Sequence, residues 1–88
     1  MSGKDYETVL AQTIDAISIF RNQTVTAETN LVSDLNLDSI GIAELVAEME
    51  DRFGVIIPME KLQEIRTVRD IARSLVSLGE PHRDLESV

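Results

Sequence analysis

Ser39 is the side chain of this sequence best placed for chemistry, because a leucine-rich loop leads to it at a predicted helix start. The preceding Asp38 fits an N-cap, since its carboxylate can accept a hydrogen bond from the free N–H groups of the first turn. A phosphodiester on the Ser39 hydroxyl would lie beside these N–H groups and the positive end of the helix dipole, which favours it by about 0.3 to 1 kcal/mol. Capping alone would also explain both residues, so this pattern leaves two interpretations open.

Calcium binding is a competing chemistry for the same segment. Asp34, Asn36 and Asp38 occupy the first, third and fifth positions of an EF-hand-like loop. The rest of the pattern fails, because position six is Ser39 instead of glycine and position twelve is Leu45 instead of a bidentate glutamate. The sequence therefore predicts no metal site.

Catalysis is not expected from this chain. A nucleophilic serine needs a nearby base, and the one histidine, His82, falls in a predicted C-terminal tail. Glu44 and Glu48 are one turn apart on the exposed face of a predicted helix, where acids usually serve solvation. Cysteine is absent, which removes thiolate nucleophiles. The sequence thus indicates a protein that is not an enzyme.

Acidic residues dominate the sequence and are unevenly placed. Sixteen acids against eight bases give a formal charge of -8, which disfavours binding to nucleic acid and to anionic lipid. The segment 22–51 has no Lys or Arg but holds seven acids: Glu28, Asp34, Asp38, Glu44, Glu48, Glu50 and Asp51. An ordinary solvated face would have this composition, but a docking surface for basic proteins also explains the asymmetry of sign.

The composition also bears on compartment and size. No stretch has the length of a membrane span, and the N-terminal segment lacks the apolar core of a signal peptide. We therefore expect a cytoplasmic monomer without membrane insertion. Eighty-eight residues suffice for one domain, which we place at 1–80 and follow with a polar tail at 81–88.

The predicted fold class is all-α: a four-helix bundle of three main helices and one short helix, with a long loop between helices one and two. The first helix is expected to begin near Lys4. Its inner face contains Tyr6, Leu10, Ile14 and Ile17. The loop from Arg21 to Leu37 lacks periodicity, yet its apolar residues predict that it packs against the core. These are Val25, Leu31, Val32, Leu35 and Leu37.

A second helix is predicted from 38 to 53, closed by Gly54 in the left-handed conformation. Its apolar face contains Ile42, Leu45, Val46, Met49 and Phe53. The run 55–57 is interpreted as a buried loop, because no second strand is available to pair with it.

The remaining chain predicts two more helices. Pro58 can start a short helix within 59–64, with Leu62 and Ile65 directed inward and Met59 assigned to the core. Thr67 and Asp70 form a capping-box-like start for the last helix. Its apolar stripe contains Val68, Ile71, Ala72 and Leu75, and Gly79 and Pro81 are expected to end it.

Segments spread in order along most of the chain fit one known family. They are Asp38-Ser39-Ile40, Glu44–Val46, Glu50–Val55, Ile57-Pro58 and Thr67–Ile71. Together they resemble acyl carrier proteins, in which a triplet similar to the first of these opens the second helix. The resemblance implies that a phosphopantetheinyl transferase attaches 4′-phosphopantetheine from coenzyme A to Ser39, with Asp38 as the motif neighbour. The arm would carry acyl groups as thioesters to enzymes of fatty acid, lipid or related biosynthesis.

A docking surface is expected around the arm. It would present Ile40, Asp34, Glu44 and Glu48 to basic-surfaced enzymes that load or transfer acyl groups. A specialised aminoacyl, D-alanyl or peptidyl carrier has a similar motif, and an acidic helical binding module without a prosthetic group has a similar charge pattern. Both alternatives stay open at this point.

Two positions depart from the pattern of fatty-acid-type carriers, which commonly have Gly in place of Asn36 and an acid in place of Gly41. A Gly in the first turns of a helix costs about 0.5 to 1 kcal/mol relative to Ala. We therefore expect Gly41→Ala to stabilise the helix, with Gly41 reflecting either drift or close approach of a partner. The Asp-Ser-hydrophobic-Gly order resembles D-alanyl and some specialised carriers, which predicts a dedicated pathway.

Overall fold

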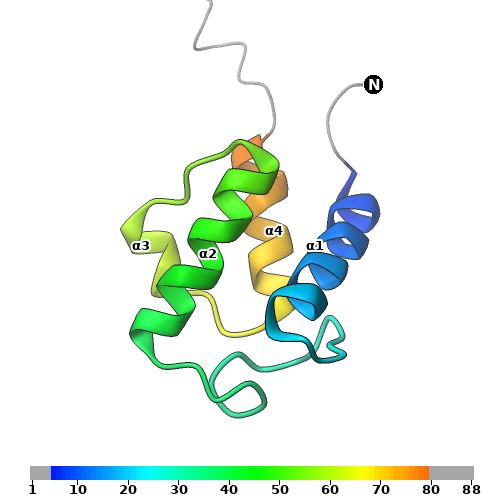
Figure 1. Cartoon of the computed structure of the whole chain (residues 1–88). Helices are drawn as coiled ribbons and strands as arrows, with labels where there is room; N and C mark the ends of the chain where they lie inside the picture. Colours follow the sequence, from blue (N-terminus) through cyan, green and yellow to red (C-terminus); the bar gives the residue numbers. More distant parts are fainter. Residues whose placement is uncertain (1–4, 80–88) are drawn as a thin grey trace, which may run out of the picture.

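The computed structural model describes residues 5–79 and contains four helices: α1 (Tyr6–Arg21), α2 (Ser39–Phe53), α3 (Met59–Leu62) and α4 (Val68–Gly79) (Figure 1). Within these residues the β-structure is limited to an isolated bridge between Asn30 and Thr67. The predicted all-α class, with three main helices, one short helix and a long first loop, is confirmed. The expected helix start at Lys4, Pro81, His82 and the tail at 81–88 lie outside the described residues.

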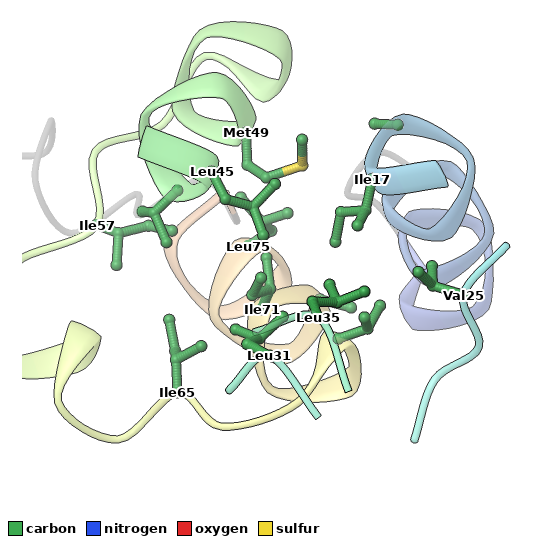
Figure 2. Close-up of a cluster of buried hydrophobic side chains, with 14 of the residues drawn as sticks. Ile17, Val25, Leu31, Leu35, Leu45, Met49, Ile57, Ile65, Ile71 and Leu75 are labelled. Atoms are coloured by element: carbon green, nitrogen blue, oxygen red, sulfur yellow. The ribbon is translucent and has the colours of Figure 1, made fainter. Parts of the chain in front are cut away.

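One hydrophobic core joins α1, α2, α4 and the long loop. Figure 2 shows Leu45 and Met49 of α2 facing Ile71 and Leu75 of α4, with Leu31 and Leu35 of the loop beside them. The predicted inner face of α2 is confirmed, since Leu45, Val46 and Met49 are buried and Ile42 and Phe53 pack partly buried against the core.

The buried face of α1 is rotated from the predicted one. Val9, Thr13, Ala16 and Ile17 are buried, whereas the expected Tyr6, Leu10 and Ile14 are only half-buried. α1 packs chiefly on α4. Thr13 can be buried because its hydroxyl donates to the carbonyl of Val9 at 2.7 Å. The local apolar count could not anticipate this self-satisfied threonine.

The long loop is fastened to the start of α4 by main-chain hydrogen bonds. The N–H of Leu31 donates to the carbonyl of Arg66 (2.9 Å), Val68 donates to Thr29 (3.1 Å) and Arg69 donates to Ala27 (2.9 Å). Its apolar residues Val25, Leu31, Leu35 and Leu37 are buried, as predicted. Val32 is an exception, with 54% of its surface exposed.

Local capping signals correctly predict the start of α4. The N–H of Asp70 donates to Thr67 Oγ1 (3.3 Å), and the N–H of Thr67 donates to Asp70 Oδ2 (3.1 Å). This reciprocal pair is the predicted capping box. The structure describes α4 up to Gly79, so the predicted stop at Gly79 and Pro81 stays a prediction.

The α2–α3 connection differs from the prediction at two apolar residues. Ile57 is buried, and its N–H donates to Glu50 Oε2 at 2.8 Å, but Ile56 is 79% exposed. Met59 is 69% exposed instead of lying in the core. α3 is a single turn without a buried residue, so it cannot turn a full face inward. Ile65, just after α3, is buried as expected, and Leu62 is partly buried.

Candidate functional site

The start of α2 presents Ser39 to solvent. Asp38 Oδ1 accepts a hydrogen bond from the N–H of Gly41 at 2.8 Å, which confirms Asp38 as the N-cap. Ser39 is the first residue of the helix and is exposed, and within the described chain its hydroxyl makes no hydrogen bond. Ile40 follows with 69% of its surface exposed. The hydroxyl is therefore accessible on a helix end that its neighbour holds in place.

The approach to Ser39 is fixed by a turn at Asn36. Asn36 has φ 57°, in the left-handed region that Gly and Asn adopt most easily. The next residue, Leu37, is 7% exposed, and its N–H donates to the carbonyl of Leu31 at 3.0 Å. Asn36 thus occupies a position that suits Gly or Asn, which gives its departure from the family pattern a conformational reason.

Gly41 lies against the end of the same loop. A Cβ added at Gly41 would meet Leu37 Cδ2 at 3.0 Å and Asp38 Oδ1 at 3.3 Å. The close approach that glycine permits here is to the protein's own loop. Both departures from the family pattern therefore have reasons within the chain, and the dedicated pathway stays a prediction without structural support from them.

A groove of about 610 Å³ begins beside Ser39, between α2, α3 and the long loop. Asp38 and Ser39 line it together with Gln63 and Arg66. Its apolar lining includes Val32, Leu37, Ile42, Met59 and Leu62. The sequence does not predict this groove, because its apolar pattern assigns Val32 and Met59 to the core, whereas both are exposed. Met59, an apolar residue at the start of a helix of one turn, was the sequence feature that could have indicated the groove.

The acids that the sequence singled out have different roles. Asp34 Oδ2 accepts from the N–H of Asn30 at 2.8 Å, and Glu48 pairs with Arg52 at 3.0 Å one turn on. Glu44 is exposed and makes no ion pair within residues 5–79. The predicted acidic surface is thus partly committed to intramolecular bonds, and Glu44 is the predicted docking acid that remains free.

Glu28, the first acid of the segment 22–51, takes part in a three-residue contact with Arg69 and Tyr6, which are far from Ser39 in the sequence. Arg69 of α4 pairs with Glu28 of the loop and donates to the hydroxyl of Tyr6 in α1 at 3.0 Å. The hydrogen bond to Glu28 and its negative charge raise the pKa of Arg69 above its ordinary value. This contact ties the loop that leads to Ser39 to α1 and α4.

Residues 5–79 contain neither a cluster of metal-ligating side chains nor a membrane-spanning helix. No group of three or more His, Asp or Glu side chains is placed to hold a metal ion. Among the described helices, none is long and apolar enough to cross a membrane.

The known proteins named below are similar to this chain, and each of them is an acyl carrier protein. Residues 8–75 match the family described as "Phosphopantetheine attachment site". The chain is 36% identical over 66 residues to the acyl carrier protein of Helicobacter hepaticus, which covers 75% of this chain and 86% of that protein. It is 39% identical over 62 residues to the acyl carrier protein of Thermobifida fusca, covering 70% and 78%. It is 37% identical over 71 residues to the meromycolate extension acyl carrier protein of Mycolicibacterium aurum, covering 81% and 73%.

Proposed function

Because the chain belongs to the phosphopantetheine-attachment family of acyl carrier proteins, we propose that Ser39 is the residue to which its phosphopantetheine arm is attached. Family membership establishes a non-catalytic carrier of acyl groups on a covalent 4′-phosphopantetheine. The observation that carries the assignment is the exposed, unbonded hydroxyl of Ser39 at the start of α2, on the lining of an apolar groove.

The residues around Ser39 fit this group. The hydroxyl is accessible to a modifying enzyme, and Asp38 holds the helix end that presents it. Ser33, an exposed serine of the loop before α2, does not line the groove. When bound, the arm supplies a terminal thiol that holds the acyl group as a thioester.

The groove beside Ser39 gives the chain a means to shelter cargo. Leu37, Ile42 and Leu62 offer an apolar surface on which an alkyl chain would be removed from water at a gain of about 25 cal/mol per Å². The exposed Val32 and Met59 flank the same space. An alkyl cargo suits this lining better than a charged aminoacyl group, which favours a fatty acyl carrier over the D-alanyl alternative.

Partner enzymes are proposed to dock on the exposed residues around Ser39. Ile40 offers an apolar contact, and Glu44 offers a free negative charge for a basic surface. Glu48 contributes less because Arg52 offsets its charge, and Asp34 acts mainly in holding the loop. Besides a phosphopantetheinyl transferase, the partners would be basic-surfaced acyl-loading and acyl-transfer enzymes. The carrier would serve them as a monomer in the cytoplasm.

The attachment site is tested by mass spectrometry. Incubation with coenzyme A, Mg²⁺ and a phosphopantetheinyl transferase of broad specificity should add one phosphopantetheine to the wild-type chain and to Ser33→Ala. The Ser39→Ala chain should gain none. Modification of Ser39→Ala, or no modification of the wild type with several transferases, would contradict the assignment.

The docking surface is tested by charge reversal at two places on one helix. Glu44→Lys should slow loading about fivefold, as expected for a contact worth about 1 kcal/mol, and added salt should reduce the difference because it screens exposed charges. Asp51→Lys makes the same change of charge near the far end of α2 and should have a smaller effect. Equal slowing by the two variants would indicate a response to net charge alone.

A further inference from the structure

We propose that Arg66 holds the phosphodiester of the arm attached to Ser39, an inference that rests on the proposed function. Arg66 is the cationic residue of the groove, since the other polar residues described in its lining are Asp38, Ser39 and Gln63. A phosphodiester on Ser39 would add a negative charge directly beside Asp38. A cation at the same groove would offset the repulsion between these two charges.

Main-chain hydrogen bonds connect Arg66 to the loop segment that leads to Ser39. The carbonyl of Arg66 accepts from the N–H of Leu31 at 2.9 Å, and the carbonyl of Leu31 accepts from the N–H of Leu37 at 3.0 Å. Leu37 is two residues before Ser39 and lines the groove with it. In Figure 1 the α3–α4 connection and the start of α2 lie at the same end of the bundle.

The guanidinium of Arg66 has donors available for an anion. Its hydrogen bond within the described chain runs from Nη1 to the carbonyl of Gln63 at 3.0 Å. Arg52 and Arg69, in contrast, each pair with a glutamate. The Asp70 carboxylate nearby accepts from the backbone N–H of Arg66. An arginine has five N–H donors in a planar arrangement that suits phosphate oxygens.

The phosphodiester is a better partner than the cargo for this cation. It is bonded directly to the serine oxygen, stays charged at neutral pH and is the same whichever acyl group is carried. A cargo carboxylate would lie at the far end of a flexible arm, and the groove that would receive it is lined mainly by apolar side chains. Arg66 would thus restrain the base of the arm without selecting its cargo.

Thermal unfolding of apo and holo forms tests this role without an activity assay. The variants are Arg66→Gln and, as a matched control, Arg73→Gln, which removes an exposed arginine of α4 outside the groove. In low salt, the Tm difference between holo and apo forms should be smaller in Arg66→Gln than in wild type by about 1 to 5 °C. It should be unchanged in Arg73→Gln, and about 0.5 M salt should remove the effect of Arg66→Gln.

A second readout reports on the contact directly. The side-chain Nε–Hε NMR signal of Arg66 should shift when the apo protein becomes holo, whereas that of Arg73 should not. A holo-to-apo Tm difference that is equal in the two variants, with no shift at Arg66, would overturn the proposal. A shift seen only when the arm bears an acyl group with a terminal carboxylate would also overturn it, in favour of cargo recognition.

Failure of the underlying assignment is distinguishable from failure of the Arg66 proposal. Intact mass shows first whether phosphopantetheine is attached and whether Ser39→Ala prevents it. If Ser39 is modified and Arg66 has no effect, the carrier assignment stands and the Arg66 role does not. If Ser39 is not modified, both fail.

Discussion

Replacement of Gly41 by alanine separates a helix-propensity effect from a packing effect. In an isolated helix the change is favourable, since Gly is about 1 kcal/mol less favourable than Ala in a helix interior. In this protein the added Cβ would lie 3.0 Å from Leu37 Cδ2 and 3.3 Å from Asp38 Oδ1. The propensity gain is therefore opposed by crowding against the loop that positions Ser39.

The size of the crowding effect depends on how far Leu37 can move. Overpacking usually costs about 1 to 3 kcal/mol, and the low end applies because the crowded atom is a terminal methyl of a side chain that lines the groove. We therefore expect Gly41→Ala to change the free energy of unfolding by less than about 0.5 kcal/mol. This replaces the stabilisation predicted from helix propensity alone.

Urea unfolding of the wild-type chain and four variants measures the two effects. Ala47→Gly, at an exposed position of α2, should lower the free energy of unfolding by about 1 kcal/mol and calibrates propensity in this helix. Leu37→Val removes the crowded Cδ2 but leaves the contact with Asp38 Oδ1. Gly41→Ala made in that background should therefore be more favourable than in wild type, by up to about 1 kcal/mol. The reasoning is refuted if Gly41→Ala stabilises equally with Leu37 and with Val at position 37.

Three further changes test the site and the core. Asn36→Val should lower the free energy of unfolding by about 1 to 2 kcal/mol in urea unfolding, because a β-branched residue resists the left-handed conformation, whereas Asn36→Gly should not destabilise. Asp38→Ala should cost about 1 kcal/mol and expose the first turn of α2 to faster amide hydrogen exchange; unchanged exchange at Gly41 would contradict its role as the cap. Met49→Ala should cost about 2 to 5 kcal/mol, whereas Met59→Ala should cost far less because its side chain is exposed, and equal losses would contradict this difference.

Features set by neighbouring residues were predictable from the sequence. The cap at Asp38, the end of α2 at Gly54 and the capping box of Thr67 and Asp70 depend on hydrogen bonds or backbone angles within one helical turn. The exposed position of Ser39 follows from the same local signals. The resemblance to carrier proteins required the motif around it together with the similar segments along most of the chain.

Tertiary structure decided which apolar residues would be buried and what lies beside Ser39. Thr13 is buried in α1 while the expected Leu10 and Ile14 are only half-buried. Met59 lies outside the core. Both differences arise because burial depends on which helix packs opposite. Arg66 lines the groove because hydrogen bonds hold the α3–α4 connection against the long loop. The sequence by itself determined the helices, their ends and the serine, since these depend on local periodicity and caps; the groove and its cation required the packing of segments far apart in the chain.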